Sequence, residues 1–133
     1  MLSLEIITPE KTIVKDEVDV VEATGAEGEF GIMPGHTQFL TALAIGEIRY
    51  KKGNETVYLA SSGGFAEVVE DKVTLLVDTA ERSQEIDVDR AKRAMERAES
   101  ALKTMTYDEA EYRLLEMALH RAIARIGVAG KKL

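Results

Sequence analysis

The apolar pattern of the chain changes its period once, near residue 86, and this change restricts the fold more than any other feature. Before it, apolar and polar residues alternate in short runs separated by glycine or proline, which is typical of β-strands. After it, apolar residues recur every three or four positions, as on one face of an α-helix, and no glycine occurs before Gly127. The pattern predicts an α+β chain with a β domain at residues 1–84 and a helical domain at residues 85–133.

Nine apolar runs in the first part predict nine strands with no helix between them. They lie at residues 4–8, 12–14, 18–23, 28–32, 39–43, 47–50, 57–60, 65–69 and 73–77. Gly53-Asn54 separates two of them and is a two-residue hairpin signal, because both residue types tolerate positive φ. Glu70-Asp71 separates two others in the same way, with weaker turn chemistry. Strands at this spacing favour an antiparallel β-sandwich or flattened barrel.

Two amphipathic helices are predicted in the second part. Asp87 is well placed as the N-cap of the first, whose apolar arc is unusually rich in small residues. That arc consists of Ala91, Ala94, Met95, Ala98, Ala101, Leu102 and Met105. Residues 106–111 contain two capping-box patterns, which predict a turn near residues 104–108 and a second helix that ends at Gly127 or Gly130. The short link predicts a two-helix antiparallel hairpin.

Arginines border the apolar faces of the two predicted helices. Arg121 and Arg125, one turn apart, project within the apolar arc of the second helix rather than across from it. Arg90 lies at the edge of the small-residue stripe, on the same side as Asp87 and Arg97. Each arginine alone is compatible with a side chain that extends from the core edge or pairs with a carboxylate. Together they favour an anion with several oxygens, such as a polyphosphate.

The other residues between the two predicted helices indicate that the bound anion is a purine nucleotide. The alanines leave room for a flat group, and Asp87 and Glu81 can accept hydrogen bonds from an exocyclic amine. No Walker lysine or Mg²⁺-binding serine or threonine follows a phosphate loop, so the pattern favours nucleotide sensing rather than hydrolysis.

The inventory of reactive residues argues against an enzyme. The chain has no cysteine, and its two histidines, His36 and His120, lie in different parts, so thiol chemistry and a histidine-based metal site are not expected. Residues 1–86 carry a net charge of −9 and residues 87–133 carry +2, which together give −7 and argue against nucleic-acid binding. We expect no signal peptide, because the N-terminus lacks a basic segment followed by an apolar run. We expect no direct membrane insertion, because no apolar stretch approaches the ~20 residues that span a bilayer.

Three segments resemble the epsilon subunits of bacterial F-type ATP synthases, and the likeness covers the whole chain. Residues 28–36, GEFGIMPGH, are similar to the family segment G-x-[FL]-G-[IL]-[LM]-P-[GN]-H. Residues 62–68, SGGFAEV, are similar to S-G-G-F-x-E-V. Residues 86–91, IDVDRA, match the [IL]-D-x-x-R-A motif of the nucleotide-binding members known from bacilli.

The resemblance implies an ATP site made from both helices and the segment before them. Its residues are Glu81, Ile86, Asp87, Arg90, Ala91, Arg121 and Arg125. ATP is the implied regulatory ligand, and no metal is required by the sequence. His120 stands where a lysine is common in the family, so the resemblance implies no contribution from that position.

The resemblance also implies a non-catalytic rotor subunit at the cytoplasmic face of the cell membrane. The β domain would bind the gamma subunit and the c-ring, with Glu29, Met33 and His36 facing the ring. His36 is otherwise compatible with a solvated loop residue. The hairpin would switch between a folded state favoured by ATP and an extended state that reaches the alpha and beta subunits and blocks ATP hydrolysis. The alternative is a free-standing nucleotide sensor without assembly partners.

Overall fold

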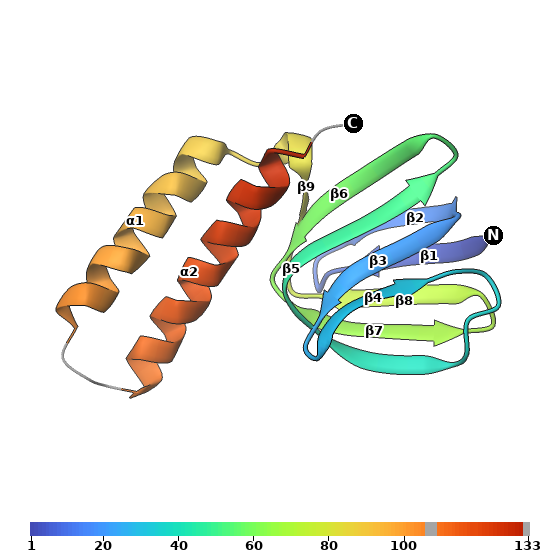
Figure 1. Cartoon of the computed structure of the whole chain (residues 1–133), viewed down its shortest axis with the longest axis horizontal. Helices are drawn as coiled ribbons and strands as arrows, with labels where there is room; N and C mark the ends of the chain where they lie inside the picture. Colours follow the sequence, from blue (N-terminus) through green and yellow to red (C-terminus); the bar gives the residue numbers. More distant parts are fainter. Residues whose placement is uncertain (106–108, 132–133) are drawn as a thin grey trace.

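The computed structural model of the chain consists of a curled β domain and a two-helix hairpin that projects from one end of it (Figure 1). The structure describes residues 1–105 and 109–131. The strands are β1 (Leu2–Ile7), β2 (Thr12–Val18), β3 (Val20–Gly25), β4 (Gly28–Ile32), β5 (Phe39–Lys52), β6 (Glu55–Ser61), β7 (Gly64–Val69), β8 (Lys72–Val77) and β9 (Ala80–Arg82). A short 3-10 helix, η1 (Ser83–Glu85), leads into α1 (Val88–Thr104) and α2 (Glu109–Ala129). The predicted α+β fold is confirmed.

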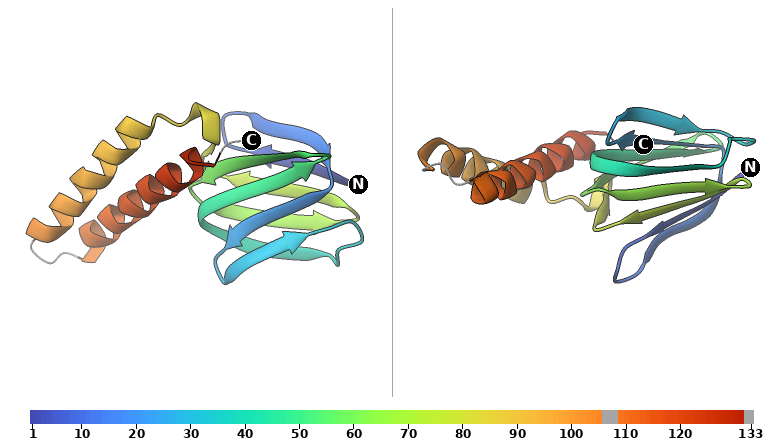
Figure 2. Two further views of the ribbon diagram at one scale, coloured as in Figure 1. Left: turned by 45° about the horizontal axis from the view of Figure 1, so that its top comes forward. Right: turned by 90° about the horizontal axis from the view of Figure 1, so that it is seen from below.

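The strands form a sheet that curls into two facing layers (Figure 2). Their order is β2-β1-β8-β7-β5-β3-β4, and β6 pairs with both β5 and β9. Among the described pairs, β1 and β8 run parallel, whereas the others are antiparallel. The alternation of residues fixes which side of a strand is buried but not the direction of a distant partner, so the parallel pair was not predicted.

The two runs at residues 39–43 and 47–50 belong to one 14-residue strand, β5, and were wrongly predicted as two. The first half of β5 pairs with β7 and the second half pairs with β6, so the strand passes from one layer to the other. Gly46 lies in the second half, and a Cβ placed there would come within 2.9 Å of the Thr24 side chain. The glycine that permits this close approach also breaks the apolar alternation from which strands are predicted.

Both predicted two-residue turns are present. Lys52 and Glu55 are paired across Gly53-Asn54, and Gly53 has φ of 60°. Glu70 and Asp71 join β7 to β8 with φ of 46° and 63°, the positive values that a type I′ turn needs. Strand β9 was not predicted, because three partly exposed residues carry no readable alternation.

The core of the β domain is formed by the inward-facing residues of both layers. Its largest fully buried side chains are Leu2, Leu4, Ile6, Ile32, Ile48, Leu59 and Leu75. Each contributes about 1.5–3 kcal/mol relative to an exposed position. Burial of these side chains therefore stabilises the contact between the two layers.

The helices follow their predicted bounds closely. The Asp87 carboxylate accepts a hydrogen bond from the backbone N–H of Arg90 at 3.1 Å, which confirms it as the N-cap of α1. Ala91 and Ala98 are buried in α1, as expected for a small-residue face that lets the two helices approach closely. Helix α2 ends before Gly130, one of the two predicted positions. The predicted turn begins after Thr104, but residues 106–108 lie outside the described residues.

The hairpin is attached to the β domain through the C-terminal end of α2. Val128 and Ala129 are buried there in a small apolar cluster with Ala60 of β6 and Ile86. The rest of the hairpin extends past the end of the β domain (Figure 1). Attachment at one end leaves a seam between α2 and the nearby edge of the β domain.

Candidate ligand site between the hairpin and the β domain

A groove of about 610 Å³ lies in this seam. Its lining residues are Ser62, Asp78, Thr79, Glu81, Ala94, Met117, Ala118, Arg121, Ala122 and Arg125. The first four belong to the β domain, Ala94 belongs to α1, and the remainder belong to α2. The volume is within the range of small-molecule sites, and the small side chains of the three alanines leave space for a flat group.

An ion pair connects the two sides of the groove. The Nε of Arg125 donates to Oε1 of Glu81 at 2.7 Å, and a guanidinium NH₂ of the same arginine donates to Oε2 at 3.2 Å. Two parallel hydrogen bonds of this kind suit the planar guanidinium and fix its direction. The pair therefore holds Arg125 in the groove and joins α2 to β9.

Arg121 lines the same groove one helical turn before Arg125, and its side chain is exposed. Within residues 1–105 and 109–131 it has no ion-pair partner. Its positive charge is therefore available to an anion in the groove.

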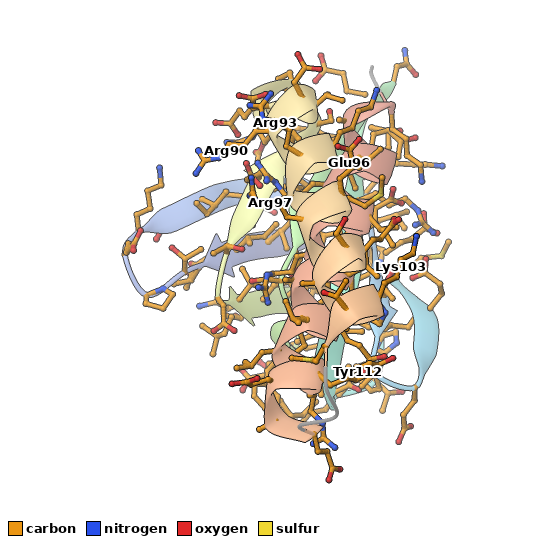
Figure 3. The ribbon with its side chains drawn as sticks, turned by 90° about the vertical axis from the view of Figure 1, so that its left-hand side faces the viewer. Arg90, Arg93, Glu96, Arg97, Lys103 and Tyr112 are labelled. Atoms are coloured by element: carbon orange, nitrogen blue, oxygen red, sulfur yellow. The ribbon has the colours of Figure 1, made fainter. Side chains whose placement is uncertain are left out.

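Two further arginines lie on the face of α1 that carries Ala94. Arg90, Ala94 and Arg97 are spaced four and three residues apart and so share one face of the helix. Ala94 lines the groove, and Figure 3 shows Arg90 and Arg97 projecting from the same edge of α1. Both arginines are exposed and have no carboxylate partner in the described part of the chain. The small-residue face of α1 thus carries positive charge along its rim.

The predicted site residues take three different positions. Glu81, Arg121 and Arg125 come together in the groove, whereas Arg90 is not among the lining residues and lies one turn before Ala94 on α1. Ile86 and Ala91 are buried behind it, so they support the seam rather than line it. The carboxylate of Asp87 is used by the helix N-terminus and is not among the lining groups.

Two hydroxyl residues of the groove were not predicted. The backbone N–H and the hydroxyl of Thr79 both donate to the Ser62 Oγ, at 2.9 and 2.8 Å. The Ser62 N–H donates in turn to the Thr79 carbonyl at 3.2 Å. These residues are 17 positions apart, so no local pattern could have connected them.

Two of the three predicted ring-facing residues, Met33 and His36, lie at the other end of the β domain. The Gly35 N–H donates to Asp71 in the β7–β8 turn at 2.7 Å, whereas the groove lies beside the opposite end of β7. Met33 is 62% exposed, and the His36 ring packs edge-on against Phe39. The loop of Met33 and His36 therefore presents an exposed apolar side chain and a fixed histidine far from the hairpin. Glu29 does not lie with them, because it is paired with Thr24 near the hairpin end of β4. Its carboxylate is 3.5 Å from Arg49, which also binds Glu47.

None of the helices in residues 1–105 and 109–131 has the length and apolar character needed to cross a bilayer. The same residues hold no group of three or more histidine, cysteine, aspartate or glutamate side chains able to bind a metal.

A β-sandwich followed directly by a helical hairpin is the domain order of the delta/epsilon class of rotary ATP synthase subunits. The family model of the ATP synthase delta/epsilon chain β-sandwich domain matches residues 1–83, and that of the long α-helix domain matches residues 84–130. The chain belongs to this family. Its curated relatives include the ATP synthase epsilon chains of Geobacter sulfurreducens, 53% identical, and Geobacter metallireducens, 52% identical. Each alignment covers 98% of this chain and 94% of the relative.

Solved structures agree with this assignment. A chain in the Euglena gracilis mitochondrial ATP synthase, OSCP/F1/c-ring in rotational state 1, has a TM-score of 0.85 and 27% identity, covering 98% of this chain and 81% of that one. A chain in the central stalk/c-ring of the Tetrahymena thermophila mitochondrial ATP synthase shares the fold, with a TM-score of 0.71 and 13% identity. Epsilon chains are non-catalytic subunits, so the predicted resemblance and the predicted lack of catalysis are both confirmed.

Proposed function

We propose that this chain is a central-stalk subunit that binds ATP as a regulatory ligand in the groove between its hairpin and its β domain. The observation that carries the proposal is that Arg121 and Arg125 line one groove, while Arg90 and Arg97 lie on the face of α1 whose Ala94 lines the same groove. In the described part of the chain, Arg125 has a carboxylate partner and the other three have none. A cluster with this excess of guanidinium groups suits a triphosphate better than a single carboxylate.

In the groove without ligand, Arg125 is already paired with Glu81. The carboxylate is bound to the guanidinium that a phosphate would otherwise bind. Bound ATP must therefore share or displace this contact, while Arg121 is accessible from the start. The alanine floor supplies space for the base.

The position of the groove explains how ATP would control the hairpin. Its walls come from α2, α1 and the β domain, so the complete site exists only when the hairpin is folded onto the β domain. A ligand shifts a conformational equilibrium by its difference in affinity for the two states. ATP would thus favour the folded hairpin. Loss of ATP would release arginines toward acidic surfaces of the alpha and beta subunits and inhibit hydrolysis.

The β domain would attach the chain to the rotor. The matching chains in the solved structures belong to central-stalk and c-ring assemblies, which supports gamma and c-ring partners for this chain. The loop with Met33 and His36 lies at the end of the β domain away from the hairpin. It would therefore face the ring while the hairpin stays free to move. This attachment would place the chain at the cytoplasmic face of the membrane through its partners.

Calorimetric titration of the whole chain with ATP tests the nucleotide site. We expect saturable heat for the wild type and at least about tenfold weaker binding for Arg121→Ala and Arg90→Ala, since one charge-assisted contact contributes about 1.5–3 kcal/mol. The matched control is Arg113→Ala, because Arg113 is exposed on α2 and pairs with Glu109 rather than lining the groove. A wild type without saturable heat would refute ATP sensing. Unchanged binding by Arg121→Ala would place the ligand elsewhere.

Cell fractionation tests assembly against a free-standing sensor. We expect the tagged chain to sediment with membranes and to be recovered with gamma and c subunits. A chain found only as a soluble monomer would contradict the rotor role.

A further inference from the structure

We propose that Ser62 and Thr79 of the β domain bind the nucleoside end of the nucleotide and form a third wall of the site. This inference rests on the proposed ATP function and adds residues that neither helix contains. Both residues line the groove, opposite the arginines of α2. Ser62 follows β6 directly, and Thr79 precedes β9 by one position.

The hydrogen bonds between these residues leave specific groups available to a ligand. The Ser62 Oγ accepts from both the N–H and the hydroxyl of Thr79, so its two lone pairs are used. The Ser62 hydroxyl proton remains for donation. The Thr79 hydroxyl donates its proton to Ser62, so only its lone pairs remain, and these can accept a hydrogen bond from a ligand. The pair therefore presents one donor and one acceptor side by side.

The backbone around the pair holds these groups in place. Ser62 donates to the Thr79 carbonyl, and the Asp78 N–H donates to the Gly63 carbonyl at 3.1 Å. Two neighbouring links thus tie the ends of β6 and β8 together. A ligand that bonds to this pair meets groups that are already oriented, which lowers the entropy lost on binding.

The charges of the groove decide which end of the nucleotide lies here. Asp78 and Glu81 stand on the β-domain side, whereas the arginines stand on the helix side. Phosphate oxygens are attracted to the arginines and repelled by the carboxylates. The ribose hydroxyls and the base carry no charge and offer both donors and acceptors. The geometry therefore places the triphosphate against Arg121 and the nucleoside against Ser62 and Thr79.

This orientation makes the nucleotide a direct connection between the hairpin and the β domain. A ligand held by arginines alone would join α1 to α2 without bonding to the β domain. A ligand that also bonds to Ser62 and Thr79 stabilises the seam itself. Its binding energy then opposes release of the whole hairpin.

The test titrates ATP and inorganic tripolyphosphate into the whole chain and into the double variant Ser62→Ala/Thr79→Val. We expect about tenfold weaker ATP binding by the double variant, equivalent to about 1.4 kcal/mol, and no change for tripolyphosphate. Thr79→Ser keeps a hydroxyl and should bind ATP within about twofold of wild type. The control is Thr56→Val, because Thr56 lies in β6 about 20 Å from Ser62 by strand rise.

The outcomes separate this inference from the proposed function. A wild type that does not bind ATP overturns both. If ATP binding weakens in Arg121→Ala but not in the double variant, the role of Ser62 and Thr79 is refuted while the proposed ATP site stands. An equal loss of ATP and tripolyphosphate affinity in the double variant overturns the assigned orientation. If the double variant lacks the wild-type circular dichroism spectrum, the single variant Ser62→Ala carries the same test.

Discussion

An ionic contact next to the C-terminal end of α2 should strengthen hairpin docking without involving the nucleotide site. The Lys131 ammonium is 2.5 Å from Glu47 Oε1 and lies 5.7 Å above the centre of the Tyr58 ring. Glu47 is 12% exposed, and its second oxygen is 2.8 Å from Arg49. Arg49 also pairs with Glu22 at 2.9 Å, and these carboxylates raise its pKa, Glu22 most of all. The acceptor for Lys131 is therefore fixed before the hairpin docks.

The contacts of Lys131 give the free energy of docking that is lost when its charge is removed. Lys131→Met keeps most of the side-chain length but loses an ion pair worth about 0.2–1 kcal/mol and a cation–π contact worth about 0.5–1 kcal/mol. Glu47 stays paired with Arg49, so no unpaired buried charge adds to the cost. The sum, about 0.7–2 kcal/mol, lowers the ratio of docked to released hairpins by roughly 3- to 30-fold.

Energy transfer between two dyes measures this ratio, because the chain has no cysteine of its own. Dyes on Ser100→Cys in α1 and Thr56→Cys in β6 report docking during a urea titration. We expect Lys131→Met to release its hairpin at lower urea than the parent and to respond less to added salt, since the lost contact is partly electrostatic. The control is Lys103→Met, on the exposed face of α1. Equal release midpoints for the Lys131→Met variant and the parent would refute the reasoning.

Two further predictions concern the β domain. Gly64→Ala should lower the free energy of unfolding by about 3 kcal/mol or more, because Gly64 has φ of 152° and its Cβ would lie 1.9 Å from the Leu76 carbonyl oxygen. The control is Gly53→Ala, at φ of 60° in open space, which should lower the free energy of unfolding by about 1 kcal/mol. If urea unfolding gave equal losses for the two variants, the close approach at Gly64 would be contradicted. Burial raises the pKa of Tyr50 from its ordinary 10.0, against a smaller opposing effect of Arg82. The neutral phenol therefore stabilises the fold below that pH, and this contribution is lost as the pH rises through the folded pKa. Tyr50→Phe should flatten the alkaline loss of stability above about pH 10, and an unchanged pH profile would count against this assignment.

The sequence predicts those parts of the fold that depend on local pattern. The alternation of Leu4 and Ile6 places these residues in the core, and the spacing of Ala91 and Ala98 places them against the second helix. Each of these outcomes depends on neighbours within a few residues. The division into a β domain and a hairpin follows from the same local signal.

Features that arise from distant parts of the chain were not predicted. Strand β5 is continuous because it pairs with two different partners, and β1 meets β8 across about seventy residues. The Glu81–Arg125 pair joins residues 44 positions apart, although both were predicted as ligand contacts. The Ser62–Thr79 pair had no signal in the sequence, because a single hydroxyl residue in a turn has many other roles.

The position of β9 has a mechanical consequence. A pull on the hairpin reaches the β domain through η1 and is applied first to β9, three residues paired with β6. Behind β9 stands β8, which is hydrogen-bonded on both sides, to β1 and to β7. A load along β8 must break two rows of hydrogen bonds at once, whereas β9 separates after one short row. Under tension the chain therefore yields at β9, and Glu81 moves away from Arg125 while the rest of the β domain stays folded.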